Sequence, residues 1–534
     1  MICAIRRMKG LPEKIATLLL AVAVISGGRV SAQNLDQTGV TLLRAMTTNV
    51  DGSGIRVAQP EANTDGNTNH PSAFEVNPAA MGQPTNLFTY FSDAGFTNGF
   101  PNSVGTESGH ADAVGGFFYG LSSGIATNVA HIDNFDADHF INNYVISNLT
   151  VLDDLVVNQS FTFNPLSVAD QQAVDSAYDD YAEMFGTIFV SAANNIGNSA
   201  VVCAPGTAYN CISVGAYANG TYGNSIGPTI DNGRCKPDLT APSGVTSFST
   251  PQVAGAVAVL AQAAWRGDGG GDTNAAFDMR TIKALLLNGA VKPADWTNSN
   301  SSPLDARYGA GVLNVFNAYE QLAGGKNNSG ATNVISIGAA HPPVAITNTV
   351  SPGSGWNRQV LTSGATNDTV NHYFFNVSNG VVTATLVWNR QLGETNINDL
   401  DLFLFNAANS NFVACSTSRV DNVEHIFLPH LAAGRYDLQV LKNGGTNVVS
   451  DAETYALAWA FVAPTMNIAK SGANLALTWP VYPAGFRIEA TTNLASSAWS
   501  TNNLGLPTVT NSRNSLILSA TNALQFFRLR QPNF

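Results

Sequence analysis

The stretch TSFSTPQVAGAVAVLA, residues 246–261, decides how the larger part of this chain is interpreted. Pro251 suits the first turn of a helix, and the run after it is apolar on every side, so the stretch predicts a buried helix that begins near Ser247. Backbone N–H groups at a helix N-terminus are unpaired and carry partial positive charge, so they would stabilise an oxyanion that forms beside Ser247. The alternative interpretation is that Ser247 is an ordinary N-cap.

The residues on either side of this helix predict an α/β domain. From about Gly39 to Gly325, short β-branched runs alternate with Ala-rich stretches, which indicates helices packed around a mostly parallel sheet. The segment GGKNNSG, residues 324–330, then indicates a linker, because Gly, Asn and Ser are turn residues rather than element interiors. Beyond it apolar and polar residues alternate with period two, which predicts two all-β domains. The expected division is a signal peptide at 1–32, the α/β domain at 33–325, a linker at 326–343, a β-sandwich at 344–463 and a small C-terminal β-module at 464–534.

The first 32 residues have the layout of a secretory signal peptide. Basic residues precede an apolar run over 15–25, and small residues follow it, with cleavage expected after Ala32. That run is too short to span a bilayer comfortably, and no later segment is uniformly apolar over about 18 residues. We therefore expect a secreted, extracellular or cell-surface protein without a membrane span.

The charge balance argues against nucleic acid as a partner. Removal of residues 1–32 leaves 20 basic and 36 acidic residues, a formal charge of −16, and phosphate binding needs a basic face. Four cysteines remain after that cleavage, too few for a disulfide framework. Cys203 and Cys211 are the preferred pair for one local bridge, and unpaired buried thiols are the alternative.

Two further segments carry residues that are suited to catalysis. The segment GHADAVGG, residues 109–116, places His110 just before small residues that could start a closely packed helix, although a lone histidine is more often structural. The segment TIFVSAANN, residues 187–195, is a β-branched strand that runs into Asn194 and Asn195. An asparagine at a strand end is usually a turn residue, but its side-chain N–H could also serve an oxyanion.

In order, spacing and local sequence, these segments resemble the subtilase family of serine peptidases. Residues 246–255 resemble its Gly-Thr-Ser-x-Ala-x-Pro-x-Val-Ala-Gly signature, which implies that Ser247 is the nucleophile. Residues 110–116 resemble His-Gly-Thr-His-Val-Ala-Gly, which implies that His110 is the general base. Residues 190–197 resemble Val-Val-Ala-Ala-Gly-Asn-x-Gly, which makes Asn195 the oxyanion donor and puts Asn194 where glycine is usual.

Other blocks extend the resemblance over about 270 residues. Residues 156–161 resemble the family's edge strand that pairs with extended substrate, which implies that Ser160 and Phe161 lie near the specificity pocket. Residues 205–216, 236–242 and 305–314 resemble three structural blocks of the catalytic domain.

The match departs from the family at the triad acid. The family's first block is an apolar strand that ends in the catalytic aspartate, and the segment SGIRVAQPEA, residues 53–62, occupies its place with Glu61 at that position. A glutamate can also accept the histidine N–H and stabilise the imidazolium. The alternatives are that Glu61 is merely solvated and that the acid is Asp51, Asp65 or Asp112.

The resemblance implies a serine endopeptidase that acts on polypeptides through an acyl-enzyme, as a monomer and without an organic cofactor. The rival interpretation is an inactive subtilase scaffold that acts as a binding or adhesion protein, because Glu61 and the residues after His110 depart from the family pattern.

The appended domains resemble known companions of subtilases. Residues 398–402, 421–424 and 433–440 resemble the β-jelly-roll domain that follows the catalytic domain in one branch of the family. Its acidic residues could hold calcium as a structural ion or could simply be solvated: Asp399, Asp401, Asp421 and Glu424. The last unit resembles C-terminal β-modules of exported bacterial proteins, for which anchoring or sorting are candidate roles.

Overall fold

The computed structural model of the chain describes residues 31–63, 71–147, 149–163, 165–196, 201–345, 350–446, 448–495, 498–501, 504–510, 513–520 and 524–530. Almost all of the predicted signal peptide lies outside these ranges, as does Asp65. Cleavage after Ala32 therefore stays a prediction.

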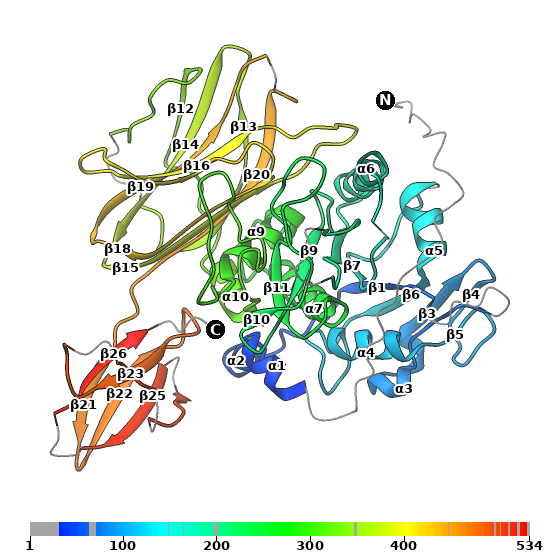
Figure 1. Cartoon of the computed structure of the whole chain (residues 1–534), viewed down its shortest axis with the longest axis horizontal. Helices are drawn as coiled ribbons and strands as arrows, with labels where there is room; N and C mark the ends of the chain where they lie inside the picture. Colours follow the sequence, from blue (N-terminus) through cyan, green and yellow to red (C-terminus); the bar gives the residue numbers. More distant parts are fainter. Residues whose placement is uncertain are drawn as a thin grey trace.

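A nine-stranded, mostly parallel sheet forms the centre of the α/β part (Figure 1). The strands run in the order β10-β9-β8-β7-β1-β6-β3-β4, and β11 also pairs with β9. Only the outermost pairs, β10 with β9 and β3 with β4, are antiparallel. The predicted α/β class with a mostly parallel sheet is thus confirmed. The strands are β1 Arg56–Glu61, β3 Phe88–Ser92, β4 Gly95–Thr97, β6 His131–Asp136, β7 Val156–Gln159, β8 Ile188–Ala192, β9 Ile212–Ala218, β10 Thr221–Tyr222 and β11 Leu239–Pro242, with a separate pair β2 Ala73–Glu75 and β5 Thr106–Glu107.

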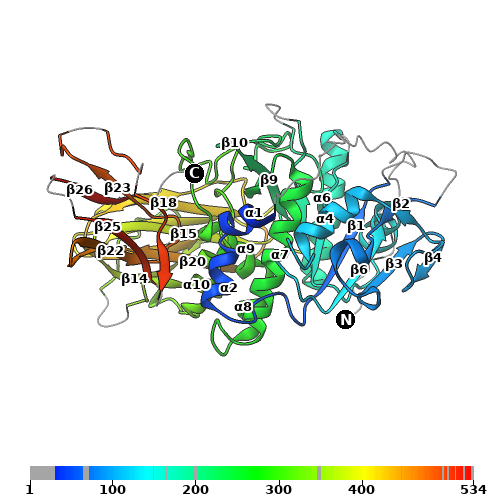
Figure 2. The ribbon, with the colours of Figure 1, turned by 90° about the horizontal axis from the view of Figure 1, so that it is seen from below.

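Helices cover both faces of this sheet (Figures 1 and 2). The predicted buried helix is α7, Thr246–Trp265, and nearly every residue in it is buried. It packs against α4, Gly109–Phe118, and against strands β7, β8 and β9. The others are α1 Ser31–Gln37, α2 Val40–Met46, α3 Pro78–Met81, α5 Ala137–Phe140, α6 Val168–Phe185, α8 Thr273–Phe277, α9 Met279–Gly289 and α10 Val315–Ala323, with short helices η1 Thr85–Leu87 and η2 Ile141–Ile146.

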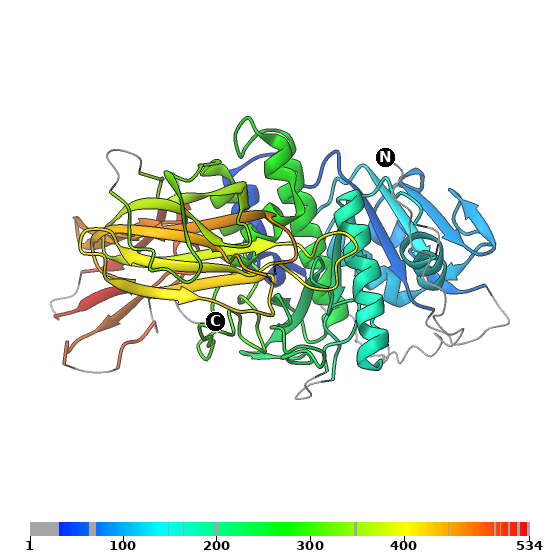
Figure 3. The same cartoon turned by 90° about the horizontal axis from the view of Figure 1, so that it is seen from above.

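Two antiparallel sheets follow and face each other as a sandwich (Figures 1 and 3). Tyr373, Leu402 and Leu457 are among the residues from both sheets that share one apolar core. One sheet has the order β12-β14-β19-β16-β17 and the other β13-β20-β15-β18. The strands are β12 Ala331–Ser336, β13 Ser354–Thr362, β14 Asn367–Val377, β15 Gly380–Trp388, β16 Leu400–Asn406, β17 Phe412–Ser416, β18 Val423–Leu431, β19 Gly434–Lys442 and β20 Ala452–Val462.

The predicted linker is only partly irregular. Residues 331–336 form β12, which pairs with β14 along its whole length. It lies at the edge of its sheet, its alternate residues are exposed and none is buried, so it lacks the buried apolar face by which a sequence reveals a strand.

The sandwich packs directly on the α/β part. Helix α9 contacts β13, β15 and β20, and α10 contacts β13. Trp356 of the sandwich belongs to the core of the α/β part, and its ring N–H donates to the Leu322 carbonyl at 3.0 Å. Asn288 of α9 accepts hydrogen bonds from Thr383 and Thr385 of β15. Residues of the sandwich therefore extend the apolar core of the α/β part across the interface, while the sandwich keeps a separate core of its own.

The last unit has a small core of its own around Leu477, Trp479, Ile488 and Leu516. Its strands are β21 Asn467–Ser471, β22 Asn474–Pro480, β23 Arg487–Thr491, β24 Thr508–Thr510, β25 Arg513–Ser519 and β26 Phe526–Arg530. They form a four-stranded sheet, β21-β22-β25-β24, and a ribbon of β23 with β26.

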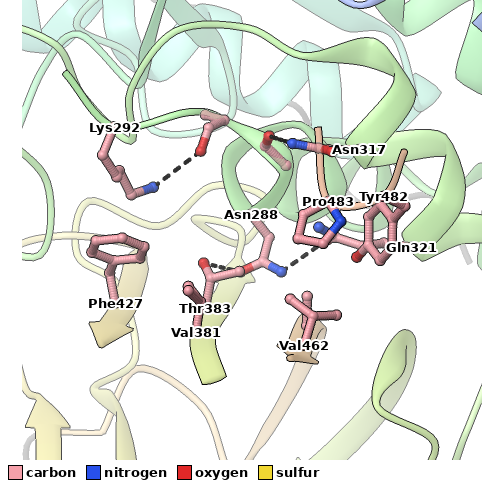
Figure 4. A pocket seen from close by; sticks show the side chains of 13 residues that line it. Asn288, Lys292, Asn317, Gln321, Val381, Thr383, Phe427, Val462, Tyr482 and Pro483 are labelled. Atoms are coloured by element: carbon pink, nitrogen blue, oxygen red, sulfur yellow. Dashed lines mark hydrogen bonds between the residues drawn. The ribbon is translucent and has the colours of Figure 1, made fainter. Parts of the chain in front are cut away.

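The loop after β22 packs this unit against the rest of the molecule. The Tyr482 hydroxyl lies 3.1 Å from the Ser354 hydroxyl, and the Ala484 N–H donates to Asn317 at 2.8 Å. Together with α9, α10 and the sandwich, this loop lines a cavity where the three parts meet (Figure 4).

The predicted Cys203–Cys211 bridge is wrong. All four cysteines in the described residues are free thiols. Cys203 accepts a hydrogen bond from the Asn194 amide at 3.3 Å, whereas Cys211 is fully buried next to β9. Among the helices that the structure describes, none is long and apolar enough to cross a membrane.

Candidate active site

The parallel sheet brings the predicted site residues to one edge. Glu61 is the last residue of β1, Ser160 follows directly after β7, and Asn195 lies three residues after β8. Because β1, β7 and β8 run parallel, their carboxyl ends lie at the same edge, which is where α/β folds place their sites. His110 and Ser247 come to this edge in the first turns of α4 and α7.

Glu61 contacts His110 directly. Its Oε2 lies 2.8 Å from His110 Nδ1. The Glu61 side chain is 2% exposed and that of His110 is 17% exposed, so the contact is shielded from water while the ring reaches the surface. Burial alone would lower the pKa of His110, but the charge and hydrogen bond of Glu61 outweigh it and raise the pKa above its usual value.

Two of the alternative acids have other partners. Asp51 accepts hydrogen bonds from the hydroxyl and N–H of Ser53. Asp112 accepts the Asn77 N–H at 2.7 Å, and burial raises its pKa to about 7. Asp65 lies outside the described residues. Of the candidates that the structure describes, Glu61 is therefore the carboxylate that contacts the imidazole.

Ser247 is the second residue of α7, so its N–H belongs to the unpaired first turn of that helix. Its hydroxyl donates a hydrogen bond to the Ser160 carbonyl at 3.4 Å. The ring of the next residue, Phe248, packs 5.9 Å from the His110 ring between centroids. The hydroxyl and the imidazole thus lie on two adjacent helix starts without a hydrogen bond between them.

Pro251 explains why Ser160 binds the start of α7. Pro251 lies in the helix interior rather than in its first turn. Because proline has no backbone N–H, the Ser247 carbonyl four residues earlier lacks its usual helical donor. The Ser160 hydroxyl donates to that carbonyl instead, at 2.8 Å. This bond joins the end of β7 to the turn that carries Ser247.

Asn195 is held by the same helix start. Its Oδ1 accepts the N–H of Thr246 at 2.7 Å and the Thr246 hydroxyl at 2.8 Å. With the carbonyl half of the amide fixed in this way, its N–H₂ half faces away from the helix backbone. Asn194 has a φ of 84°, a left-handed conformation in which glycine or asparagine is favoured, and this accounts for asparagine at a position where glycine is usual.

The expected substrate-pairing strand needs a correction. Residues 156–159 form β7, which pairs with β1 on one side and β8 on the other, so it is an interior strand and not an edge. Any free edge begins only after Gln159. Ser160 and Phe161 lie there, 3% and 6% exposed.

Sequence reasoning missed Gln59, which lies two residues before Glu61 and therefore on the same face of β1. Its side-chain amide donates to Glu61 Oε1 at 3.0 Å. The available signal was a polar residue in an otherwise apolar run, after Val57 and Ala58 and before Pro60.

The four acidic residues considered for calcium are not gathered into one site. Asp421 accepts the Cys235 N–H at 2.6 Å, and both oxygens of Glu424 accept hydrogen bonds from Ser416 and Ser418. Burial raises the pKa of Asp399, and it raises that of Asp401 to about 7. No group of three or more His, Cys, Asp or Glu side chains in the described ranges is arranged to hold a metal ion. A structural calcium ion stays a prediction.

Comparisons with known proteins give one family match. The family model described as "Subtilase family" matches residues 144–311, which include Ser160, Asn195 and Ser247. A comparison with curated proteins gave no match.

Solved structures give weak likenesses. The Aeromonas sobria serine protease, in complex with its chaperone, is 14% identical, with 90% of this chain and 88% of that chain covered and a TM-score of 0.37. A cold-adapted subtilisin-like serine proteinase is 19% identical over 50% of this chain and 91% of that one, with a TM-score of 0.31. Tripeptidyl peptidase 2 is 13% identical over 75% of this chain and 44% of its own, with a TM-score of 0.32. The likeness to known proteins therefore rests on the family model: residues 144–311 of this chain match the subtilase family.

Proposed function

We propose that this protein is a secreted serine endopeptidase that hydrolyses peptide bonds through an acyl-enzyme, with Ser247, His110 and Glu61 as its triad. The observation that carries the proposal is the 2.8 Å contact between Glu61 and His110, beside the helix start that holds Ser247. A buried carboxylate on the far nitrogen of a partly exposed imidazole is the arrangement that a general base needs.

The proposed reaction assigns each step to one group. Ser247 attacks the carbonyl carbon of the substrate while His110 takes its proton, and His110 returns that proton to the leaving amine. Glu61 keeps the His110 ring in one tautomer and stabilises the imidazolium. The oxyanion accepts hydrogen bonds from the Ser247 N–H and the Asn195 side chain.

The proposal requires the Ser247 hydroxyl to turn. It donates to the Ser160 carbonyl at 3.4 Å, which is a long and weak hydrogen bond. Catalytic hydrogen bonds are often long or absent without substrate and form in the complex. On this proposal the Ser247 hydroxyl leaves the Ser160 carbonyl and binds the imidazole when substrate is present.

That same hydrogen bond favours the second candidate function, an inactive subtilase scaffold that binds peptides or surfaces outside the cell. In that case Ser247 would stay bonded to Ser160, and Glu61 with His110 would be a structural ion pair.

A fluorophosphonate probe distinguishes the two candidates, because it reacts only with an activated serine. We expect the purified chain to be labelled at Ser247 and to hydrolyse casein, and we expect Ser247→Ala to abolish both. Ser249→Ala is the matched control, since Ser249 lies in the same helical turn and its buried hydroxyl donates to the Ala241 carbonyl. Lack of labelling in the folded wild type would favour the inactive scaffold.

A further inference from the structure

A buried chain of hydrogen bonds leads away from Glu61 on the side opposite to His110. Glu61 Oε1 accepts the Gln59 amide N–H at 3.0 Å, and the same nitrogen donates to the Ala111 carbonyl at 3.0 Å. Gln59 Oε1 in turn accepts the Tyr119 hydroxyl at 2.6 Å. Gln59 and Tyr119 are 0% exposed and Glu61 is 1% exposed, so water does not compete for these bonds.

The surroundings allow only one orientation of the Gln59 amide. If the amide were flipped, its oxygen would face Glu61 Oε1 and the Ala111 carbonyl, two groups that only accept hydrogen bonds. Burial raises the pKa of Tyr119 well above its usual value, so its hydroxyl keeps its proton and remains a donor. The N–H₂ half of Gln59 therefore points at Glu61.

This arrangement provides a hydrogen-bond donor for each oxygen of the Glu61 carboxylate. A buried carboxylate has to find donors for both of its oxygens, because water no longer provides them. His110 serves Oε2, and Gln59 serves Oε1. Gln59 also bridges β1 to α4, since Ala111 follows His110 directly, so a single amide contacts both the acid and the backbone that carries the base.

We propose that Gln59 is a positioning residue of this active site: oriented by Tyr119, it holds Glu61 against His110 and stabilises the Glu61 carboxylate. The inference rests on the proposed function and deepens it by assigning the group that lets a longer acid occupy this place. Gln59 itself touches no reacting atom.

The expected pH effect has a definite sign. His110 acts as a base when it is neutral, so kcat/KM rises with pH through the pKa of His110. Loss of the Gln59 donor would destabilise the Glu61 anion, which makes the neighbouring imidazolium more favourable and moves the acidic limb to higher pH. Loss of the Glu61 charge, as in Glu61→Gln, would leave burial unopposed and move that limb to lower pH.

Two substitutions of Gln59 distinguish the effect of its size from the effect of its N–H₂ donor. Gln59→Glu keeps the size but replaces the N–H₂ by an oxygen, and Gln59→Leu removes both polar atoms. We expect kcat/KM to fall by about 10²-fold in each, as misplacement of a catalytic group by about 1 Å can do. We also expect the acidic limb to move to higher pH in both. Tyr119→Phe should act in the same direction with a smaller effect.

Gln83→Leu is the matched control for lost buried amide bonds. Gln83 is also buried and donates to the Tyr119 and Thr127 carbonyls, but it has no recorded bond to Glu61 or His110. It should lower thermal stability without moving the pH profile. If it moved the profile as far as Gln59→Glu, or if Gln59→Glu left the profile where it is, the positioning role would be refuted.

A second readout does not depend on hydrolysis. Titration of ¹³C-labelled histidine by NMR in the Ser247→Ala full-length chain reports the protonation of His110, whose signal is assigned by its loss in His110→Gln. We expect Gln59→Glu to raise the titration midpoint of His110. If the wild type failed to hydrolyse casein and this midpoint still rose, the proposed function would fail while the positioning role stood. An unchanged midpoint would overturn the positioning role.

Discussion

Glu61 approaches His110 with a side chain that is one methylene longer than that of aspartate, at the end of a buried strand. The extra length is accommodated because the second carboxylate oxygen binds Gln59 instead of being left without a donor. An aspartate here would have to give up one of these two contacts. The identity of the acid and that of Gln59 are therefore linked.

At the residue scale, the first prediction concerns Glu61→Gln. The substitution keeps the shape but allows the amide to hold the wrong imidazole tautomer, and loss of a triad carboxylate of this kind costs about 10⁴-fold in kcat. We expect a loss of that order in hydrolysis of a peptide substrate, with thermal stability changed much less. A decrease of less than about tenfold would show that Glu61 is not the triad acid and would make Asp65 the next candidate.

How far the site could be predicted from sequence differs from residue to residue. Ser247, His110 and Asn195 lie in motifs whose order and spacing carry the family pattern, so their placement at one edge could be expected. Gln59 could not be assigned, because its role depends on Tyr119, which lies 60 positions away in the chain. The sequence could not decide between a Cys203–Cys211 bridge and free thiols, because spacing alone says nothing about where two side chains point.

At the element scale, α7 and the strands around it were predictable and β12 was not. A long run that is apolar on every side is typical of a buried helix, whereas β12 mixes apolar and polar residues and buries none of them. The structure of β12 comes from its pairing with β14, a contact that the local sequence does not encode.

The second prediction concerns the start of α7. Ser160→Ala removes the hydroxyl that replaces the missing Pro251 donor and leaves the Ser247 carbonyl without it. We expect a loss of about 1–2 kcal/mol in unfolding free energy, measured by urea denaturation in the Ser247→Ala background to prevent self-digestion. In the active chain kcat should fall, because the turn that holds Ser247 is less firmly placed. Equal stability in the two chains would contradict this role of Ser160.

The third prediction concerns Lys292, which lies between α9 and β18 at the cavity in Figure 4. Burial lowers its pKa to about 7, and its Nζ contacts backbone carbonyls and the rings of Trp296 and Phe427 rather than a carboxylate. The unfolded chain therefore binds a proton here between about pH 7 and 10 that the folded chain does not, so stability rises with pH over this range.

Lys292→Met should remove the free-energy cost of burying the charged Lys292 ammonium group. We expect it to raise the unfolding free energy at pH 6 by about 1–3 kcal/mol, with the gain shrinking towards pH 10. Lys283→Met is the contrast, since Lys283 is equally buried but lies 3.3 Å from Asp238, and its loss should destabilise. A Lys292→Met effect that is independent of pH would contradict the assignment.

At the scale of the whole molecule, the α/β part and the sandwich depend on each other. Every residue of α9 except Arg280 is buried, because one side of the helix faces α7 and α10 and the other faces β15 and β20. Charged contacts reinforce this interface, such as the buried pair of Arg390 with Asp179 at 2.7 Å. The C-terminal module, in contrast, has its own core and connects through the loop at 481–484.

The fourth prediction follows from this difference. A chain that ends at residue 463 loses the contacts of the loop at 481–484, namely the hydrogen bonds of Tyr482 and Ala484 and the packing of Val481 on the core of the α/β part, so we expect its Tm to fall by a few °C and its kcat/KM to stay within about twofold. A chain that ends at residue 325 exposes the apolar side of α9 and the place of Trp356, so we expect it to aggregate or to unfold at room temperature. Scanning calorimetry in the Ser247→Ala background and peptide hydrolysis by the active chains check both outcomes. If the chain that ends at 325 were soluble with an unchanged Tm, the shared core would contribute little, and the sandwich would have to be regarded as an independent domain.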